Sequence, residues 1–210
     1  MGLMMMYEHE NRLRDAGYQM IAGCDEVGRG PLAGPIVCAA VILNPTHLIA
    51  GLDDSKKLTA SKREALDVEI RQHALAYAIV FIDVEEVDAL NVYQASRLGM
   101  MRALDQLDRT PDYVLSDAMP LTRNCQTLSL IKGDQQSASI AAASILAKVA
   151  RDAYMIELGK QYPQYGFERH KGYPTKGHLE ALKQYGPVPE HRRSFAPVKT
   201  LKSKQQTFNL

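Results

Sequence analysis

The sequence has no tryptophan, only three cysteines, and no apolar run close to the ~18 residues that span a bilayer. Its methionine-rich start turns polar at Glu8 and lacks the cationic beginning of a secretory signal. The cysteines Cys24, Cys38 and Cys125 form no C-x-x-C pair, and the first two lie in apolar runs. We therefore expect a cytoplasmic protein with reduced thiols, and no contact with a membrane.

An excess of charge of one sign is also absent, because 25 Lys and Arg oppose 24 Asp and Glu. The charges are nevertheless unevenly placed. Residues 169–204 hold nine Lys and Arg but two Asp and Glu, and the rest of the chain is acidic. A basic tail on an acidic body is typical of nucleic-acid contact, although a solvated tail has the same composition.

Apolar runs and helical periodicity predict five strands and four helices. The strands are expected over 19–26, 36–43, 75–82, 113–116 and 128–131, and the helices over 59–73, 91–107, 137–158 and 176–185. Short connections predict an antiparallel meander for the first three strands, and strands reached through helices can extend it in parallel. The result is an α/β domain with a mixed five-stranded sheet and helices on its faces. We expect one domain over 1–210, with a core over 19–160 and a helical, basic segment over 161–200.

Two helices carry more detailed predictions. Thr59 or Ser61 can cap the first of them, and Glu64 would complete a capping box with Ser61. In the second, four residues at helical spacing predict a stripe that faces the core: Tyr93, Met100, Leu104 and Leu107.

Acidic residues follow three of the predicted strands. Asp25 and Glu26 end the first, Asp117 ends the fourth, and Asp134 follows the fifth. If these strands are neighbours, four carboxylates meet at one edge of the sheet. The alternative is that each acid caps a helix or starts a turn, and Asp134 can be an N-cap.

A cluster of four carboxylates is stable only around a cation, because like charges at close range repel one another. The donors are all hard oxygens, which suits Mg²⁺ or Mn²⁺ and not zinc. Two such ions about 4 Å apart can activate water and stabilise a leaving oxygen in phosphoryl displacement.

The glycine-rich stretch after Glu26 resembles a dinucleotide-binding fingerprint only in its letters. Gly28-Arg-Gly-Pro-Leu-Ala33 fits G-x-G-x-x-[GA], but Pro35 and a β-branched run follow it, which predict a strand where the fingerprint requires a helix. No P-loop motif is present either. We interpret Gly28 and Gly30 as positions where the backbone approaches a sugar or phosphate closely, with Arg29 supplying charge.

Longer segments of the chain resemble bacterial ribonuclease HII. In family order over about residues 20–198 they are AGCDEVGRGPLAGPIVCAAVIL, DDSKKLT, SDAM, IKGDQQSASIAAASILAKVARD, HKGYPTKGH and HRRSFAPV. The related ribonuclease HIII has a lysine in the centre of the glycine triplet, where this chain has Arg29.

The resemblance implies a ribonuclease H-like three-layer fold with a C-terminal helical extension, and an enzyme that uses two Mn²⁺ or Mg²⁺ ions. The implied activity is cleavage of RNA in RNA–DNA hybrids and nicking of duplex DNA on the 5′ side of single embedded ribonucleotides, leaving 3′-hydroxyl and 5′-phosphate ends. The family's motif positions map the metal ligands onto Asp25, Glu26, Asp117 and Asp134, and the substrate contacts onto Gly28, Arg29, Gly30 and Tyr173.

Basic side chains outside these positions are candidate phosphate contacts. They are Lys56, Lys57, Arg169, Lys171, Arg192 and Arg193. Three histidines, His170, His178 and His191, are interpreted as packing residues or phosphate contacts and not as metal ligands.

Several alternatives stay open at this point. One is a nucleic-acid-binding module without catalysis, in which the acids are structural caps. Another is a different metal nuclease on the same fold, such as a Holliday-junction resolvase. We expect a monomer, and residues 205–210 (QQTFNL) loosely match a sliding-clamp-binding peptide, the alternative being a disordered terminus.

Overall fold

The computed structural model describes residues 3–201. Along the chain its elements are α1 (Leu3–Met6), α2 (Glu8–Asp15), β1 (Ile21–Val27), β2 (Ile36–Ile42), α3 (Ala60–His73), β3 (Ala76–Ile82), α4 (Val84–Leu90), α5 (Val92–Asp105), β4 (Tyr113–Asp117), β5 (Gln126–Leu130), the 3₁₀ turn η1 (Gly133–Gln135), α6 (Ala138–Gln161), α7 (Phe167–His170) and α8 (Lys176–Tyr185).

The five strands form one mixed sheet in the order β3-β2-β1-β4-β5. β1, β2 and β3 pair antiparallel, whereas β4 pairs parallel with β1 and β5 pairs parallel with β4. The predicted meander with a parallel extension is therefore confirmed. Because β1, β4 and β5 run the same way, their carboxyl ends share one edge of the sheet.

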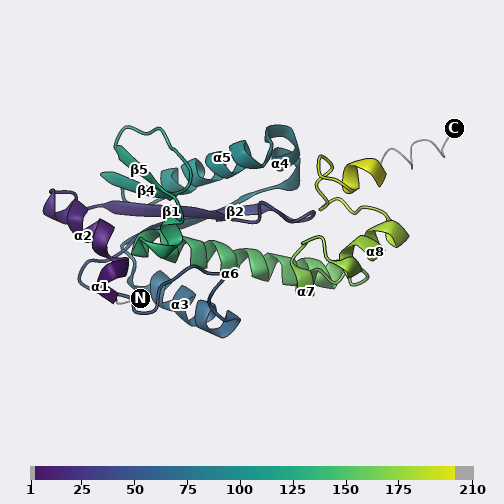
Figure 1. Ribbon diagram of the computed structural model, residues 1–210, viewed down its shortest axis with the longest axis horizontal. Coiled ribbons are helices and arrows are strands. Elements are labelled where there is room, and N and C mark those ends of the chain that lie inside the picture. Colours follow the sequence, from purple (N-terminus) through teal and green to yellow (C-terminus); the bar gives the residue numbers. More distant parts are fainter. Residues whose placement is uncertain (1–2, 202–210) are drawn as a thin grey trace.

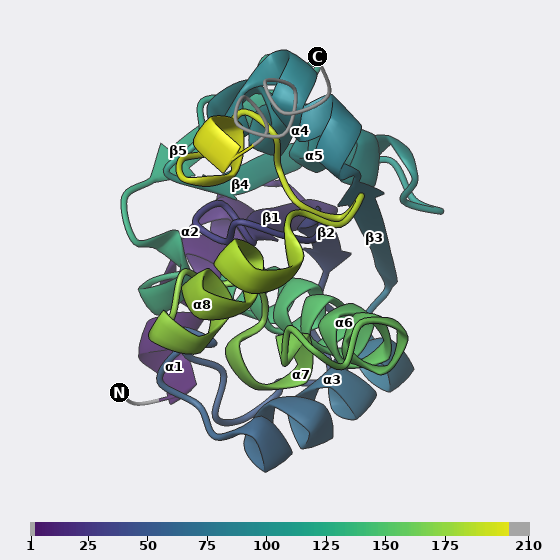
Figure 2. The ribbon, with the colours of Figure 1, turned by 90° about the vertical axis from the view of Figure 1, so that its right-hand side faces the viewer.

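Helices cover both faces of the sheet and make three layers (Figure 2). α3 and α6 pack on one face and α4 and α5 on the other. The inner strand β2 alternates between them, since Val37 and Ala39 join the α6 side while Cys38 and Ala40 join the α5 side. Burial on both faces explains why this strand is apolar throughout.

The long helix α6 lies close against β1 because Gly23 has no side chain there. A methyl group on Gly23 would collide with the backbone of Ser139. The start of α6 is also held by α2, whose buried Glu10 accepts hydrogen bonds from Ser137 Oγ at 2.6 Å and Ser139 N at 2.9 Å. A carboxylate at this end of α6 suits the helix dipole. These contacts fix the start of α6 against the first half of β1.

The helix caps settle two alternatives left open by the sequence. Thr59 caps α3, with its Oγ1 accepting from Lys62 N, so the Ser61–Glu64 capping box is not used. Ser137 caps α6 and accepts from Ile140 N. Asp134 is therefore not the N-cap of that helix, and it lies instead in η1.

The predicted core stripe of α5 is correct except at its first residue. Met100 and Leu104 are buried, and Leu107 packs against the same cluster. Tyr93 is 42% exposed, so its assignment to the core was wrong. It lies two turns before Met100, and helical periodicity does not indicate where the sheet beneath a helix ends.

The C-terminal helical extension forms a small core of its own at one end of the layers (Figure 1). Phe167 and Leu182 pack there against Leu32, Ala33 and Met155. The extension is thus attached directly to the loop between β1 and β2. Among the residues described, none of the helices combines the length and apolar character that a membrane crossing requires.

Candidate active site

The four predicted acids lie at the shared carboxyl edge of β1, β4 and β5. Asp25 and Glu26 are near the end of β1, and Asp117 ends β4. The parallel register pairs Cys24 with Ser116, so Asp25 and Asp117 come next on adjacent strands. Gly133 N donates to Asp117 Oδ1 at 2.6 Å, which ties η1, and Asp134 within it, to the end of β4. We call these four residues the acid edge.

Carboxyl groups of the acid edge repel one another, and those of Asp25 and Asp134 are buried while Glu26 and Asp117 are half-buried. Burial, followed by the charges of Glu26 and Asp117, raises the pKa of Asp25 well above its ordinary value. Burial and Asp117 raise the pKa of Glu26 to about 7, against the opposing effect of Arg29. Burial, with Asp54 and Asp117 nearby, raises the pKa of Asp134 to about 6. The site is therefore unfavourable for its own negative charge and favourable for a cation.

Oxygen atoms of the acid edge are only partly used by the protein. The second carboxylate oxygen of Glu26, Oε2, is buried and has no hydrogen-bond partner among the described residues. Asp25 Oδ1 accepts from the Glu26 amide at 2.7 Å. Within residues 3–201, no three His, Cys, Asp or Glu side chains already stand in the arrangement of a metal site. The acids are thus close enough to repel but do not form a closed ligand shell, and their all-oxygen donor set fits Mg²⁺ or Mn²⁺.

A cleft of about 260 Å³ opens beside Glu26. The predicted site residues that line it with Glu26 are Gly28, Arg29, Gly30, Lys56 and Tyr173. A Cβ placed on Gly30 would lie 3.5 Å from Tyr173 Cε1, so the glycine backbone and the tyrosine ring face each other across the cleft. Tyr173 is 42% exposed, which leaves its ring accessible to a ligand.

The two lysines of the DSKK motif differ in position. Lys56 lines the cleft, whereas Lys57 is on the surface with its Nζ 3.2 Å from Asp53 Oδ1. Partial burial would lower the pKa of Lys56, but the carboxylates of Asp54, Asp25 and Asp134 outweigh it and raise the pKa. Lys56 is therefore a cation held against the acid edge, and Lys57 is not part of the cleft.

Several residues at the site were not predicted from the sequence, among them Asp54, Ser144 and Lys148. Asp54 is buried beside Asp134 and contributes to its raised pKa. Ser144 and Lys148 line the cleft from α6, and Ser144 Oγ lies 3.0 Å from Ser55 Oγ. Asp54 could have been found from its place in the DDSKKLT segment, next to the candidate phosphate contacts Lys56 and Lys57. Ser144 was a hydroxyl within an alanine-rich helix, which is a weaker signal.

Arg192 is the clearest error among the predicted phosphate contacts. Its side chain is fully buried and donates to backbone carbonyls of Gly28, Arg29 and Gly34. It cannot reach a phosphate in solvent. Its neighbour Arg193 is exposed, as is Arg169, so the prediction stays open for those two.

The histidines pack against one another, as expected. His170 and His178 stack with ring centroids 4.5 Å apart, and His178 Nε2 lies 3.1 Å from His191 Nε2. Both His178 and His191 are buried.

Burial raises the pKa of the Cys24 and Cys38 thiols, which are free cysteines.

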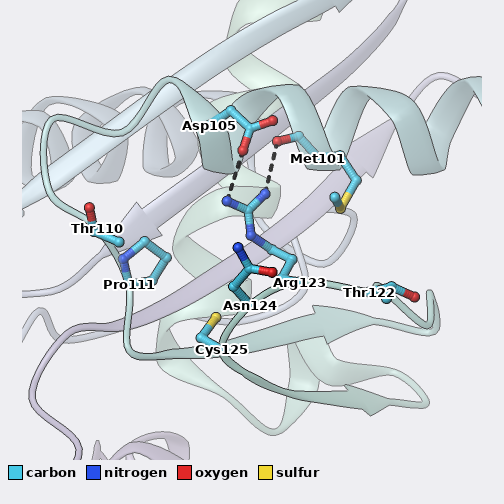
Figure 3. Close-up of a pocket in the computed structure, with 8 residues that line it drawn as sticks. All are labelled: Met101, Asp105, Thr110, Pro111, Thr122, Arg123, Asn124 and Cys125. Carbon is cyan, nitrogen blue, oxygen red and sulfur yellow. Dashed lines mark hydrogen bonds and ion pairs between the residues drawn. The ribbon is translucent and has the colours of Figure 1, made fainter.

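Another hollow, of about 420 Å³, lies away from these residues (Figure 3). It is lined by the end of α5 and by the segments that precede β4 and β5, at the amino ends of those strands. Arg123 crosses it, pairing with Asp105 at 2.8 Å and donating to the Met101 carbonyl (Figure 3). None of the predicted site residues lines this hollow.

A three-layer fold with this strand order and with acids at the carboxyl ends of β1 and β4 defines the class of the protein, a nuclease with the ribonuclease H-like fold. More particularly, the chain belongs to the ribonuclease HII family, since the family model described as Ribonuclease HII matches residues 22–198. Its activity is hydrolysis of RNA in RNA–DNA hybrids.

Individual relatives agree with this assignment. The Ribonuclease HII of Bacillus licheniformis is 55% identical over 194 residues, which are 92% of this chain and 76% of that protein. The crystal structure of the ribonuclease H2 from Pyrococcus horikoshii is 26% identical, with a TM-score of 0.77 over 90% of this chain and 99% of that one. Bst-RNase HIII in complex with Mn²⁺ is 19% identical, with a TM-score of 0.65 over 92% of this chain and 72% of that one, and shows the shared fold.

Proposed function

We propose that this protein also nicks duplex DNA on the 5′ side of a single embedded ribonucleotide, in addition to cleaving RNA–DNA hybrids. The observation that carries the proposal is the cleft beside Glu26. It joins bare glycine backbone, a cationic Lys56 and an exposed Tyr173 ring directly to the acid edge. A site of this kind can contact one sugar and one phosphate without reading base sequence.

The acid edge is proposed to hold two Mn²⁺ or Mg²⁺ ions, with Asp25 as the ligand shared between them. When bound, the ions would supply Lewis acidity for activating water and for stabilising the leaving oxygen. The unpartnered Glu26 oxygen and the raised carboxyl pKa values support this assignment. That Bst-RNase HIII, a protein of the same fold, is described in complex with Mn²⁺ is consistent with it.

The remaining residues are proposed to hold the nucleic acid. Backbone groups of Gly28, Arg29 and Gly30 would hydrogen-bond the 2′-hydroxyl, which is the group that separates RNA from DNA at a single site. Tyr173 would stack on the next deoxyribose, and Lys56 would contact a phosphate. Lys57, on the surface outside the cleft, would contribute only at longer range. Cleavage would leave 3′-hydroxyl and 5′-phosphate ends.

We further propose that the protein acts as a monomer. The clamp-binding interpretation of residues 205–210 falls outside the described residues, and it stays a prediction.

A cleavage assay with three matched duplexes tests the proposal. The substrates are an RNA–DNA hybrid, a DNA duplex with one ribonucleotide, and the same duplex without it, each with Mn²⁺, with Mg²⁺ or with EDTA. We expect one nick on the 5′ side of the ribonucleotide, a ligatable 3′-hydroxyl, no cleavage of the all-DNA duplex, and no product in EDTA. Cleavage of the hybrid alone would refute the nicking proposal while leaving the family activity intact.

A further inference from the structure

Two arginines are buried in the interior near the cleft. Arg151 on α6 and Arg192 after α8 are both 0% exposed. In the described part of the chain neither lies within ion-pair distance of a carboxylate. A buried charge without a counter-ion costs several kcal/mol unless strong hydrogen bonds compensate it. The partners of these guanidinium groups therefore indicate why the charges are there.

Within residues 3–201, the Arg192 side chain donates only to carbonyls of the loop that joins β1 to β2. Its Nη2 lies 2.6 Å from the Gly28 oxygen and 2.8 Å from the Gly34 oxygen. Its Nη1 lies 3.1 Å from the Arg29 oxygen, and its Nε lies 3.1 Å from the Gly34 oxygen. One rigid fork thus fixes both ends of the loop, a geometry that lysine cannot reproduce.

Holding these carbonyls also sets the direction of two amides. In a trans peptide the C=O and the following N–H point in opposite directions. Because the Gly28 and Arg29 carbonyls point at Arg192, the N–H groups of Arg29 and Gly30 point away from it. Neither amide has a hydrogen-bond partner among the described residues. The cleft is lined by Gly28, Arg29 and Gly30 but not by Arg192, so the free donors face the cleft side.

Arg151 connects the tyrosine segment, residues 171–173, to the loop between β1 and β2. Its guanidinium donates to the carbonyls of Ala33 at 3.2 Å, Pro35 at 3.0 Å and Lys171 at 3.0 Å. Leu32 N also donates to the Gly172 carbonyl at 2.8 Å. The glycine loop (residues 28–35, between β1 and β2) and the residues just before Tyr173 therefore form one hydrogen-bonded unit, which encloses the two buried guanidinium groups.

We propose that Arg192 is a positioning residue for ribose recognition, which aims the Arg29 and Gly30 amides at the 2′-hydroxyl of the substrate. The proposal rests on the proposed function, since it assumes that this loop contacts the ribose. It replaces the expectation that Arg192 binds phosphate. It also separates two adjacent arginines by role, because Arg193 is exposed and, among the described residues, its side chain donates no hydrogen bond to the loop.

Binding measurements on matched variants test the proposal. Fluorescence anisotropy in EDTA, where no cleavage occurs, would give the affinity for the duplex with one ribonucleotide and for the all-DNA duplex. We expect Arg192→Lys to reduce the preference for the ribonucleotide by about tenfold, the value of one or two lost hydrogen bonds, with all-DNA affinity unchanged. Arg193→Lys is the matched control and keeps the wild-type preference.

The outcomes separate the explanations. An Arg192→Lys protein that folds and keeps the wild-type preference would overturn the positioning role. Equal losses on both duplexes, with a smaller salt dependence, would also overturn it and would favour a phosphate contact. Wild-type protein that does not distinguish the two duplexes would instead refute the proposed function, and the positioning role would fall with it.

A measurement on wild-type protein keeps the test valid if Arg192→Lys does not fold. The Arg29 and Gly30 amides should exchange rapidly with solvent in the free protein, as observed by NMR. The ribonucleotide duplex should protect them, and the all-DNA duplex should not. Equal protection by both duplexes, or by neither, would contradict the proposal.

Discussion

At the scale of single residues, the two glycines of the Gly-Arg-Gly triplet have different reasons to be glycine. Gly28 has φ 107°, and a Cβ there would lie 2.8 Å from both the Pro35 oxygen and Arg151 Cδ. Gly30 has an ordinary φ, and its nearest neighbour would be the Tyr173 ring at 3.5 Å. The first glycine is required by the fold, whereas the second keeps the cleft open.

Alanine substitutions should therefore separate stability from activity. Gly28→Ala should destabilise the protein by about 1–3 kcal/mol, because it forces a side chain into a left-handed conformation and a crowded space. Gly30→Ala should change stability by less than about 0.5 kcal/mol, yet lower cleavage, since its methyl group enters the cleft. Thermal unfolding and hybrid cleavage measured on both variants check this, and a stable, fully active Gly30→Ala protein would contradict it.

Tyr173 should matter more at an isolated ribonucleotide than within a hybrid. Its exposed ring faces the glycine loop, where it is proposed to contact the sugar that follows the cleaved position. We expect Tyr173→Ala to reduce nicking of the single-ribonucleotide duplex by about tenfold more than hybrid cleavage, since stacking of a base on an aromatic ring is worth about 1–3 kcal/mol and sets the scale for such a contact. Tyr185→Ala, at another exposed tyrosine, is the control. Equal losses on both substrates would argue against this role.

At this scale, the sequence predicted the position of a residue where a local pattern determines it, and failed where contacts distant in the chain determine it. The edge position of Asp25 and Asp117 followed from apolar runs that end in an acid. The burial of Arg192 did not, because a basic segment gives no sign of which arginine turns inward. Its four hydrogen bonds join residues more than 150 positions apart in the chain.

At the scale of elements, buried histidines hold the parts of the C-terminal extension together, since they link Tyr173, α8 and the segment that follows α8. His178 Nδ1 lies 2.9 Å from the Tyr173 carbonyl, so this nitrogen must carry the proton. Its Nε2 is then the acceptor for His191 Nε2–H, and His191 Nδ1 accepts from Val188 N at 3.0 Å. The pattern requires both rings to be neutral. Burial, with His178 nearby, lowers the pKa of His191 to about 4, and burial lowers the pKa of His178.

This arrangement predicts acid sensitivity with a definite sign. The unfolded chain takes up a proton on His191 near pH 6.5, whereas the folded protein does so only near pH 4. Its contribution to stability is therefore complete above pH 6.5 and is lost as the pH falls toward 4, by about 3 kcal/mol in total.

Denaturant unfolding of wild type and of His191→Gln between pH 4 and 7 measures this contribution. The amide of glutamine can keep the donor to His178 but does not titrate, so the variant should lose less stability on acidification. Comparing the two proteins cancels the opposite effect of the raised carboxyl pKa values at the acid edge, which they share. Parallel stability curves would contradict the assignment.

Strands and long helices were predictable, and short helices were not. All five strands and the helices α3, α5, α6 and α8 follow from runs and periodicity, with ends shifted by a few residues. The helices α1, α4 and α7 have four to seven residues, too few for a periodic pattern. α2 was also missed, although its Glu10 holds the start of α6, because that contact links residues over 125 positions apart.

At the scale of the whole molecule, charge is divided between the acid edge and a basic extension. Not every arginine of the extension adds to its basic surface, since Arg192 is buried, whereas Arg169 and Arg193 are exposed. The order of the sheet brings both parts to one end, because the extension packs on the loop that follows β1. The sequence indicated both the sheet and the basic segment, but not that the segment is built around the glycine loop.

Duplex binding should therefore weaken as salt increases. Arg169→Gln and Arg193→Gln should each reduce the slope of log affinity against log salt by about 1, if each contacts one phosphate. Binding measured from low to moderate salt, with Arg97→Gln on α5 as a comparison, tests this. An unchanged slope in both variants would place the phosphate contacts elsewhere.

Direct titration with Mn²⁺ tests the central claim, that the acid edge is a cation site. By calorimetry without nucleic acid, wild type should bind Mn²⁺ and gain thermal stability, and Asp25→Asn should lose this binding while remaining folded. Asp108→Asn, at an exposed acid that precedes β4, should bind as wild type does. Undiminished Mn²⁺ binding by a folded Asp25→Asn protein would contradict the account.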